Sequence, residues 1–397
     1  MSSPYSGGRR ALSAGFPASA VRVLLDRGVA LGAFPGAVAR WGRPGGQVQT
    51  VAVGHRGLTR NRELATADLV YDLASLTKIL AATSLALIFF SRSQLDLDQP
   101  LAGGPLGPGL ALSPPGSALD WNRLTPRHLL AHQSGLRPWR PFYRLGGRLG
   151  GRLEGRGTER RALALKALSA EIPMAGPGEL TLYSDLNFVL FGFLLEEIGG
   201  EPLDVLFDRE LAGPLGLIQT GFRPGPGAVL APTEDGFRYG GPVGHPEADL
   251  KGPTPLGRPH DDNAAWLGGV SGHAGLFAPA AGAWAIADDW ARAWREGRGQ
   301  VFDRPALAEF LRPVPDRAGT GRPLGFNRLG LVSALASSAW PKNAVGHLGY
   351  TGASLWWAPD RDFIWLFLTN RVHPRAINTS WRPADYVGGP AWPMGNR

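Results

Sequence analysis

Apolar runs near both ends of the chain predict β-strands. Such runs cover 36–41, 48–53 and 69–73 in the first part of the chain, and 354–357 and 363–368 near its end. Glycine and proline between the first two runs, and Pro359-Asp-Arg-Asp362 between the last two, are typical of hairpin turns. We therefore expect a sheet that is assembled from the two ends of the chain.

Between these runs, apolar residues recur every three or four positions, which is the spacing of amphipathic helices. The segments with this pattern are 79–92, 125–132, 161–169, 186–198, 202–211 and 284–294, with a further one at 21–31. The pattern predicts an α+β fold, in which helices flank an antiparallel sheet. We expect a sheet-containing α/β domain from residues 1–76 and 330–397, a mainly helical domain from 77–329, and an active site between them.

Composition sets the limits of this picture. The chain has 397 residues and 44% apolar content, enough for one large core or two smaller ones. It lacks cysteine, which excludes disulfides, thiol catalysis and thiolate metal sites. The net charge of +8 comes almost entirely from arginine, since the only lysines are Lys78, Lys166, Lys251 and Lys342. This bias favours a compositional origin of the charge over nucleic-acid binding.

Two further segments bear on location and surface. Residues 137–161 combine arginines with repeated Leu-Gly-Gly units, and glycine disfavours a stable helix. We predict a basic loop there, acting either as a lid or as a solvated insertion. The longest apolar run, 79–90, is too short to span a membrane, and an export-like segment near the N-terminus is broken by Pro17. We expect a cytoplasmic protein, with an irregular tail over 380–397.

Ser75-Leu-Thr-Lys78 is the first candidate for chemistry. The two polar residues lie three positions apart where a strand-like run gives way to a helical pattern, so their side chains share one helix face. A serine hydroxyl becomes a good nucleophile when a neighbour accepts its proton, and a buried lysine with a lowered pKa does this. Since arginine fills almost every other cationic position, a retained lysine at this point favours proton transfer.

Two later segments complete a candidate hydrolase site. Tyr183 precedes an apolar helical run, where its phenol can share a proton with Lys78. His347-Leu-Gly349-Tyr350 precedes the last pair of strands, and a glycine on an edge strand permits close approach of a substrate. We expect the amides of Ser75 and Tyr350 to converge on a developing oxyanion.

Together these segments resemble the SxxK serine hydrolases, which include class C β-lactamases, penicillin-binding proteins and family VIII esterases. The resemblance rests on Ser75-x-x-Lys78, Tyr183-Ser-Asp185 and His347-x-Gly349, in the order of the family. It implies a β-lactamase/transpeptidase-like fold, acylation of Ser75, proton transfer by Lys78 and Tyr183, and no metal or organic cofactor. His347, Gly349 and Tyr350 would line the substrate.

Two departures from the family pattern narrow the expected function. Asp185 stands where the family usually has asparagine, and His347-Leu348 stands where β-lactamases have lysine and threonine. Because a neutral histidine and a leucine recognise a carboxylate poorly and Asp185 repels it, we expect esterase or amidase activity on small-molecule substrates rather than efficient β-lactamase activity. A muropeptide amidase, a D-Ala carboxypeptidase or β-lactamase, and an inactive ligand-binding relative are the alternatives.

Other polar clusters have competing interpretations. His260 and Asp261 either reach the pocket or brace it from behind. His128 and His132 are spaced like metal ligands on a helix, but the glutamate of a zinc-protease motif is missing, so helix packing is favoured. A metal site from His260, Asp261, Asp262 and His273 is a weaker alternative.

Overall fold

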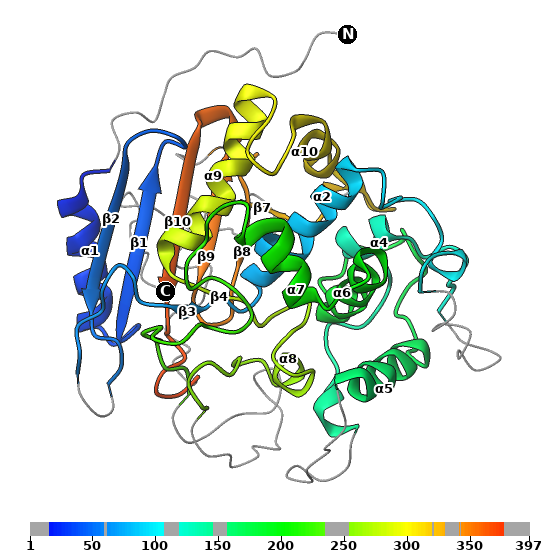
Figure 1. Ribbon diagram of the computed structural model, residues 1–397, viewed down its shortest axis with the longest axis horizontal. Helices are drawn as coiled ribbons and strands as arrows, with labels where there is room; N and C mark the ends of the chain where they lie inside the picture. Colours follow the sequence, from blue (N-terminus) through cyan, green and yellow to red (C-terminus); the bar gives the residue numbers. More distant parts are fainter. Residues whose placement is uncertain are drawn as a thin grey trace.

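The computed structural model describes residues 16–58, 62–106, 119–145, 157–234, 254–319, 321–329, 341 and 343–376. Its centre is a six-stranded antiparallel sheet in the order β2-β1-β10-β9-β8-β7 (Figure 1). The strands are β1 (Gly36–Gly42), β2 (Val48–Gly54), β7 (Asn327–Arg328), β8 (Val345–Leu348), β9 (Ser354–Ala358) and β10 (Phe363–Thr369). Since β1 pairs with β10, the sheet joins the two ends of the chain, which confirms the predicted α+β fold.

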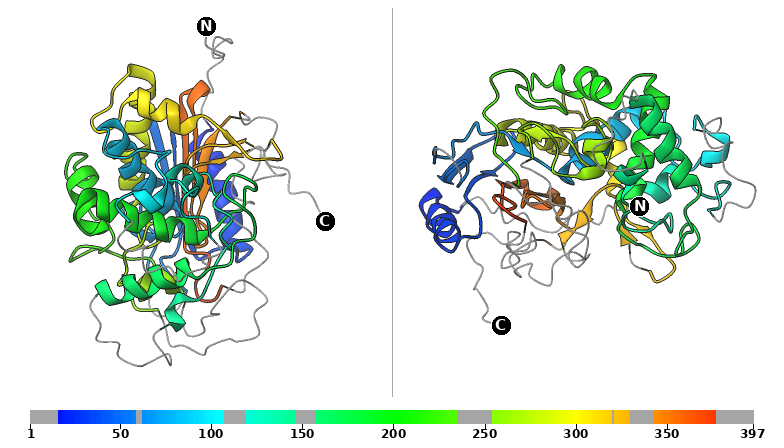
Figure 2. Two further views of the ribbon diagram at one scale, coloured as in Figure 1. Left: turned by 90° about the vertical axis from the view of Figure 1, so that its right-hand side faces the viewer. Right: turned by 90° about the horizontal axis from the view of Figure 1, so that it is seen from below.

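Both faces of the sheet are buried. All seven residues of β10 are buried, and successive side chains of a strand point to opposite faces. Trp365 and its alternate neighbours pack toward α1 (Ala18–Ala30), whereas Ile364, Leu366 and Leu368 join the core beneath the other helices. Figure 2 shows α1 on one side of the sheet and the yellow and green helices on the other. The continuous apolar run of β10 is therefore explained by burial on two sides.

Apart from α8 (Asp262–Trp266) and α10 (Arg304–Leu311), which were not predicted, the described α-helices form at or near the predicted positions. α9 (Ala280–Glu296) crosses the sheet in Figure 1, and α2 (Ser84–Ser91), α6 (Asp185–Gly199), α7 (Leu203–Phe207) and α10 lie to its right in that view. Further helices are α4 (Pro126–Leu130) and α5 (Gly157–Ser169). The π-helix η1 (Lys78–Thr83) leads directly into α2, and the π-helix η4 (Asp208–Ala212) directly follows α7. The short 3-10 turns are η2 (Leu101–Gly103), η3 (Phe142–Arg144) and η5 (Pro359–Arg361).

Some local structure differs from the prediction. Residues 157–161, expected to lie in the basic loop 137–161, instead begin α5, where Ala162, Leu163, Ala164 and Leu165 supply helix-forming side chains. Two pairs of two-residue strands also form: β3 (Tyr71–Asp72), within the predicted strand 69–73, with β4 (Phe277–Ala278), and β5 (Val314–Pro315) with β6 (Gly321–Arg322). Of these, β4, β5 and β6 were not expected, because so short a strand has no periodicity.

Other expectations lie outside what the structure describes, or stay predictions. The tail over 380–397, most of the N-terminal export-like segment and residues 146–156 of the basic loop fall outside the described residues. None of the helices in the described ranges combines the length and the apolar character needed to cross a bilayer. The division into a sheet domain and a helical domain remains a prediction.

Candidate active site around Ser75

The turn that carries Ser75 is held in an unusual backbone conformation. Between β3 and η1, Ala74 has a φ of 47°, a left-handed conformation that is costly for alanine. The buried carboxylate of Asp72 accepts hydrogen bonds from the amides of Ala74 (2.9 Å) and His260 (2.7 Å). These bonds stabilise the sharp turn that presents Ser75, which is partly exposed, next to η1.

Two side chains meet the hydroxyl of Ser75. The Nζ of Lys78 donates a hydrogen bond to Ser75 Oγ at 2.9 Å, and the hydroxyl of Tyr183 donates another at 3.1 Å. Lys78 comes from the first turn of η1 and Tyr183 from the segment before α6. The structure thus brings together the three residues predicted to be catalytic, although they are up to 108 positions apart.

The ammonium group of Lys78 is fully buried and fully hydrogen-bonded. Besides Ser75, it donates to Asp185 Oδ1 (2.7 Å) and to the carbonyl of His273 (3.0 Å), which satisfies all three N–H groups. Burial alone lowers the pKa of Lys78, but the Asp185 carboxylate, followed by Tyr183, outweighs this effect and raises it. The expected lowering of the lysine pKa is therefore wrong, because Asp185 stabilises the charged form.

Tyr183 lies among ring and cationic groups. Although 36% of this residue is exposed, burial raises the pKa of its phenol. Lys78 opposes this shift and Asp185 adds to it. The imidazole of His132 lies 4.7 Å from the tyrosine ring, and that of His347 lies 5.8 Å away, measured between ring centroids.

The segment around β8 forms another wall of the site. His347 is buried and its Nδ1 donates to the carbonyl of Leu348 (2.7 Å), while its Nε2 has no partner within the described residues. Burial, and then Lys78 and Arg322, lower the pKa of His347 well below its usual value, so the ring is neutral at neutral pH. The Gly349 backbone lies so close to Leu73 that an added Cβ would be 2.7 Å from the Leu73 carbonyl oxygen.

Two backbone amides are free at this wall. In the described part of the chain, neither Ser75 nor Tyr350 uses its amide in a hydrogen bond. The turn of Tyr350 is tied to the turn of Ser75 by the hydroxyl of Thr351, which donates to the carbonyl of Asp72 (2.8 Å). Free amides on adjacent turns are what an oxyanion requires.

His260 and Asp261 support the site from different sides. The ring of His260 stacks on Tyr350 at 5.5 Å, and its Nε2 lies 3.1 Å from Glu234. Asp261 accepts a hydrogen bond from His273 Nε2 (2.9 Å), and His273 is the residue whose carbonyl binds Lys78. Burial acts to raise the pKa of Asp261, but His273, the Ala264 amide and Lys78 lower it strongly.

Sequence reasoning missed two residues that contact Tyr183. His132 was considered only as a metal ligand or packing residue, yet its Nδ1 accepts from the Ser184 amide (3.0 Å) beside Tyr183. Arg322, on β6, places its guanidinium carbon 5.9 Å from the centre of the Tyr183 ring. The only signal for His132 in the sequence was its spacing from His128, and no signal pointed to Arg322.

The metal alternatives find no support in the described residues. There, no group of three or more His, Asp or Glu side chains is arranged to hold a metal ion. His128 Nδ1 bonds to the Thr125 hydroxyl (2.9 Å) in the cap of α4, whereas His132 faces Tyr183. The two histidines therefore serve different parts of the structure.

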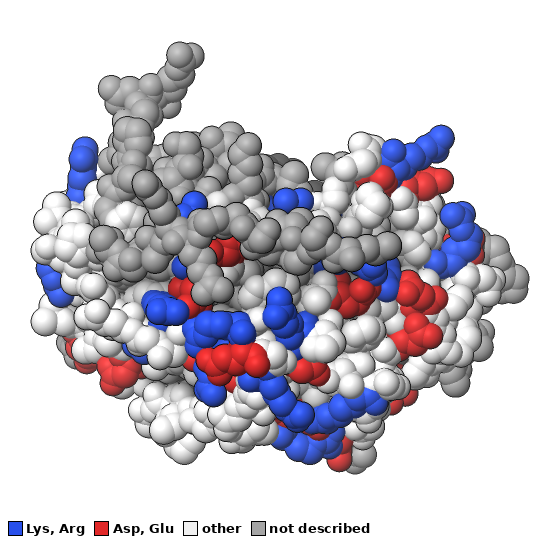
Figure 3. Space-filling view, turned by 90° about the horizontal axis from the view of Figure 1, so that it is seen from above, with Lys and Arg blue, Asp and Glu red and all other residues white. Residues whose placement is uncertain are grey.

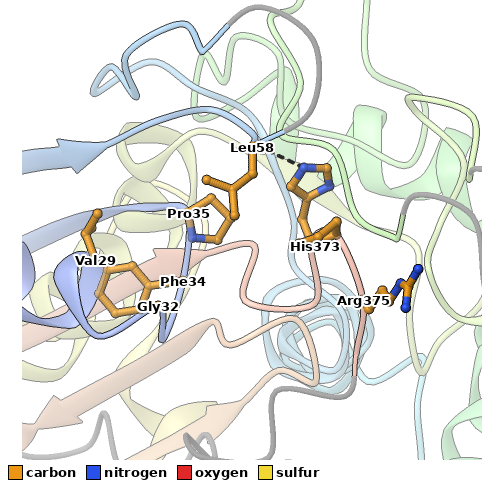
Figure 4. A pocket seen from close by; sticks show the side chains of 8 residues that line it. Val29, Gly32, Phe34, Pro35, Leu58, His373 and Arg375 are labelled. Carbon is orange, nitrogen blue, oxygen red and sulfur yellow. Dashed lines mark hydrogen bonds between the residues drawn. The ribbon is translucent and has the colours of Figure 1, made fainter.

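A cavity elsewhere in the molecule is separate from this site. It has a volume of about 330 Å³ and is lined by Val29, Gly32, Phe34, Pro35, Leu58, His373, Pro374 and Arg375 (Figure 4). The Leu58 amide donates to His373 Nε2 (3.0 Å) across it. Since none of its lining residues touches Ser75, Lys78 or Tyr183, we assign it no part in the chemistry at Ser75.

Acidic and basic side chains share the face of the molecule that Figure 3 shows. On the face shown in Figure 3, basic and acidic side chains are interspersed rather than separated into patches. Several arginines are ion-paired, as Arg127 is with Asp98 and Glu309 at 2.6 and 2.7 Å. Such pairing reduces the field that a polyanion would experience on this face.

Comparison with known proteins supplies the family. The family model named Beta-lactamase matches residues 21–387. A protein of Escherichia coli (strain K12) named "Putative D-alanyl-D-alanine carboxypeptidase" is 27% identical over 333 residues, which cover 82% of this chain and 74% of the relative.

Solved structures show the same fold. A structure titled "EstCE1, a hydrolase with promiscuous acyltransferase activity" has a TM-score of 0.70 at 23% identity, covering 89% of this chain and 93% of the other. A β-lactamase/D-alanine carboxypeptidase from Pseudomonas syringae has a TM-score of 0.64 at 16% identity, covering 90% and 95%. The expected β-lactamase/transpeptidase-like fold is confirmed. The chain belongs to the β-lactamase family and is a serine hydrolase.

Proposed function

We propose that this serine hydrolase is an esterase that acts on small, uncharged acyl groups through a covalent acyl-enzyme at Ser75. The observation that carries the proposal is the position of Ser75 Oγ, 2.9 Å from Lys78 Nζ and 3.1 Å from the Tyr183 hydroxyl. This arrangement gives the nucleophile two neighbours that exchange protons with it.

The proposed reaction has two steps. Ser75 Oγ attacks the ester carbonyl, its proton passes to the Tyr183–Lys78 pair, and the pair returns a proton to the leaving alcohol. Water then attacks the acyl-enzyme by the same proton transfers in reverse and frees Ser75. The amides of Ser75 and Tyr350 bind the oxyanion in both steps, and no metal or organic cofactor takes part.

His347 and Asp185 favour an uncharged acyl group next to Ser75. His347 is buried and neutral, and its Nδ1 is already bonded to Leu348. Asp185 places a carboxylate 2.7 Å from Lys78, which neutralises the cation nearest to the nucleophile. A substrate carboxylate next to Ser75 therefore meets little attraction from these residues.

A second candidate is a peptidase or amidase acting on peptidoglycan fragments. The observation that favours it is the 27% identity to a relative named as a D-alanyl-D-alanine carboxypeptidase, over 82% of this chain. His260 and Tyr350, with 42% of Tyr350 exposed beside the site, would then contact the peptide.

Covalent labelling tests the proposal directly. A fluorophosphonate is expected to add one phosphonyl group to the wild-type protein, detected by intact mass, and none to Ser75→Ala. Ser91→Ala is the matched control, because this exposed serine ends α2, which continues from η1, and bonds to Asp303. It should label like the wild type.

The outcomes separate the candidates. Absence of an adduct on the wild type would indicate an inactive ligand-binding relative, and labelling that survives Ser75→Ala would mean another nucleophile. Hydrolysis of p-nitrophenyl acetate and butyrate without turnover of nitrocefin or muropeptides supports the esterase. Faster turnover of muropeptides than of esters supports the second candidate, and rapid nitrocefin hydrolysis contradicts the argument from His347 and Asp185.

A further inference from the structure

Arg322 carries a buried charge that no carboxylate of the described residues balances. Only 9% of the residue is exposed, and its Nε and Nη2 atoms have no hydrogen-bond partner among the residues that the structure describes. Buried charges are normally paired, because their removal from water is costly. An unpaired, buried guanidinium therefore indicates a role that depends on its positive charge not being neutralised by a partner.

The surroundings of Arg322 point to Tyr183. β6 carries the arginine in a short hairpin with β5, and Gln133, next to His132, bonds to the carbonyl of Val314 in that hairpin (2.9 Å). This contact fixes the hairpin against the wall of the site. The guanidinium then lies 5.9 Å from the centre of the Tyr183 ring.

The groups around Tyr183 leave Arg322 as the unbalanced charge. Those facing the ring and its hydroxyl are Lys78 of η1, His132 after α4, Asp185 of α6, Arg322 of β6 and His347 of β8. Lys78 and Asp185 form an ion pair at 2.7 Å and cancel in net charge. Burial holds the pKa of both histidines well below its usual value, so both are neutral.

Arg322 keeps its charge at neutral pH. Burial lowers the pKa of its guanidinium to about 10, while Tyr183 acts to raise it. A cation in a poorly hydrated position acts strongly on a neighbouring titratable group, since little water screens it.

We propose that Arg322 supplies the positive charge that favours the ionised form of Tyr183 while the proton of Ser75 is transferred. It acts through Tyr183, as a positioning residue, and does not touch the substrate. The proposal rests on the proposed function, because it requires that Tyr183 accepts this proton. Because the Asp185 carboxylate neutralises the ammonium of Lys78, Arg322 supplies to Tyr183 the positive charge that Lys78 would otherwise supply.

The test is the pH profile of kcat/KM for p-nitrophenyl acetate, whose acyl group carries no charge. In Arg322→Met, the part of the profile in which kcat/KM rises with pH is expected to move to higher pH. We expect kcat/KM to fall on the order of tenfold at pH 7 and to recover at alkaline pH. Arg322→Lys should keep most of the wild-type profile. Arg312→Met is the matched control, since this arginine lies just before β5, is exposed and forms an ion pair with Glu309 at 2.7 Å.

A double variant distinguishes charge from shape. Asp185→Asn leaves Lys78 unneutralised, so the Asp185→Asn/Arg322→Met protein is expected to return toward the wild-type profile. Lack of any rescue, or an unshifted profile in folded Arg322→Met, overturns the proposal. If Arg322→Met does not fold, Arg322→Gln carries the same test.

Two measurements separate the remaining outcomes. A rise in KM confined to carboxylate-bearing esters would make Arg322 a substrate-binding residue and overturn the proposal. Fluorophosphonate labelling of Ser75 in alkali shows whether the variant retains the nucleophile. If the wild type itself is not labelled, the proposed function fails, whereas a labelled but unshifted variant contradicts only the role of Arg322.

Discussion

The proton balance around Ser75 is set by single side chains. Lys78 was predicted from its spacing to Ser75, and that part depends only on local geometry, since three residues span one helical turn. Its protonation was predicted in the wrong direction, because it depends on Asp185, 107 positions later, and on the His273 carbonyl. A motif identifies a pair of residues, but the field at that pair comes from the whole site.

In the proposed mechanism, the resting site holds one proton more than the active form. Lys78 and Tyr183 both direct hydrogens at Ser75 Oγ, so one proton must leave the pair before either residue can accept the proton of Ser75. Asp185 raises the pKa of both groups. Under this mechanism we expect the deprotonated, active form to be reached only at higher pH, with two pKa values that belong to the coupled pair.

Asp185→Asn is expected to shift the activity toward lower pH. Removing the carboxylate lowers the pKa of Lys78 and Tyr183, so the active form is populated earlier and kcat/KM at pH 7 rises on the order of tenfold. The measurement is the pH profile for p-nitrophenyl acetate. Asp204→Asn is a matched control, because Asp204 has an 18% exposed side chain against 20% for Asp185 and pairs with Arg223 away from Ser75. A profile that stays in place in Asp185→Asn would contradict this account.

At the scale of elements, the site is assembled from turns that the regular elements hold in place. The strands β1, β2, β9 and β10 follow from apolar runs and the long helices from periodicity, and both were predicted close to their observed bounds. The contacts of Arg322 and His132 with Tyr183 were not predicted, since Arg322 lies on a two-residue strand and His132 has a φ of 56°. Neither a strand of two residues nor a left-handed histidine leaves a pattern in the sequence.

Gly349→Ala is expected to weaken the oxyanion site. An added Cβ would lie 2.7 Å from the Leu73 carbonyl oxygen and 3.3 Å from the Ala353 Cβ, so the turn between β8 and β9 must move away from the turn of Ser75. The Tyr350 amide moves with it, and loss of one oxyanion donor costs on the order of 10²-fold in kcat.

The control for this prediction is Gly225→Ala, where an added Cβ meets nothing within 4 Å. Both proteins are compared with the wild type by kcat for p-nitrophenyl acetate and by thermal melting. A Gly349→Ala protein with unchanged kcat would mean that Tyr350 does not contribute its amide.

At the scale of the whole molecule, the sheet couples the two ends of the chain to the helices. One core contains sheet residues such as Val38 and Leu366 together with Leu80, Leu190 and Trp290 from η1, α6 and α9. A second core lies between the sheet and α1, and Trp365 of β10 belongs to it. Since β10 contributes to both cores, we expect the predicted sheet and helical domains to unfold in a single cooperative transition.

Trp365→Ala tests this coupling from the side of the sheet that faces away from the catalytic helices. Trp365 is 4% exposed and packs on Trp41 with ring centroids 5.5 Å apart, so its truncation is expected to cost about 3–5 kcal/mol of unfolding free energy. Helical circular dichroism and fluorophosphonate labelling of Ser75 should be lost at the same, lower denaturant concentration. Ile218→Ala, at a side chain 78% exposed, should change stability by less than about 0.5 kcal/mol. If Ser75 labelling in Trp365→Ala persists at denaturant concentrations at which the sheet has unfolded, the sheet and the helices unfold separately. The core that they share then does not couple them.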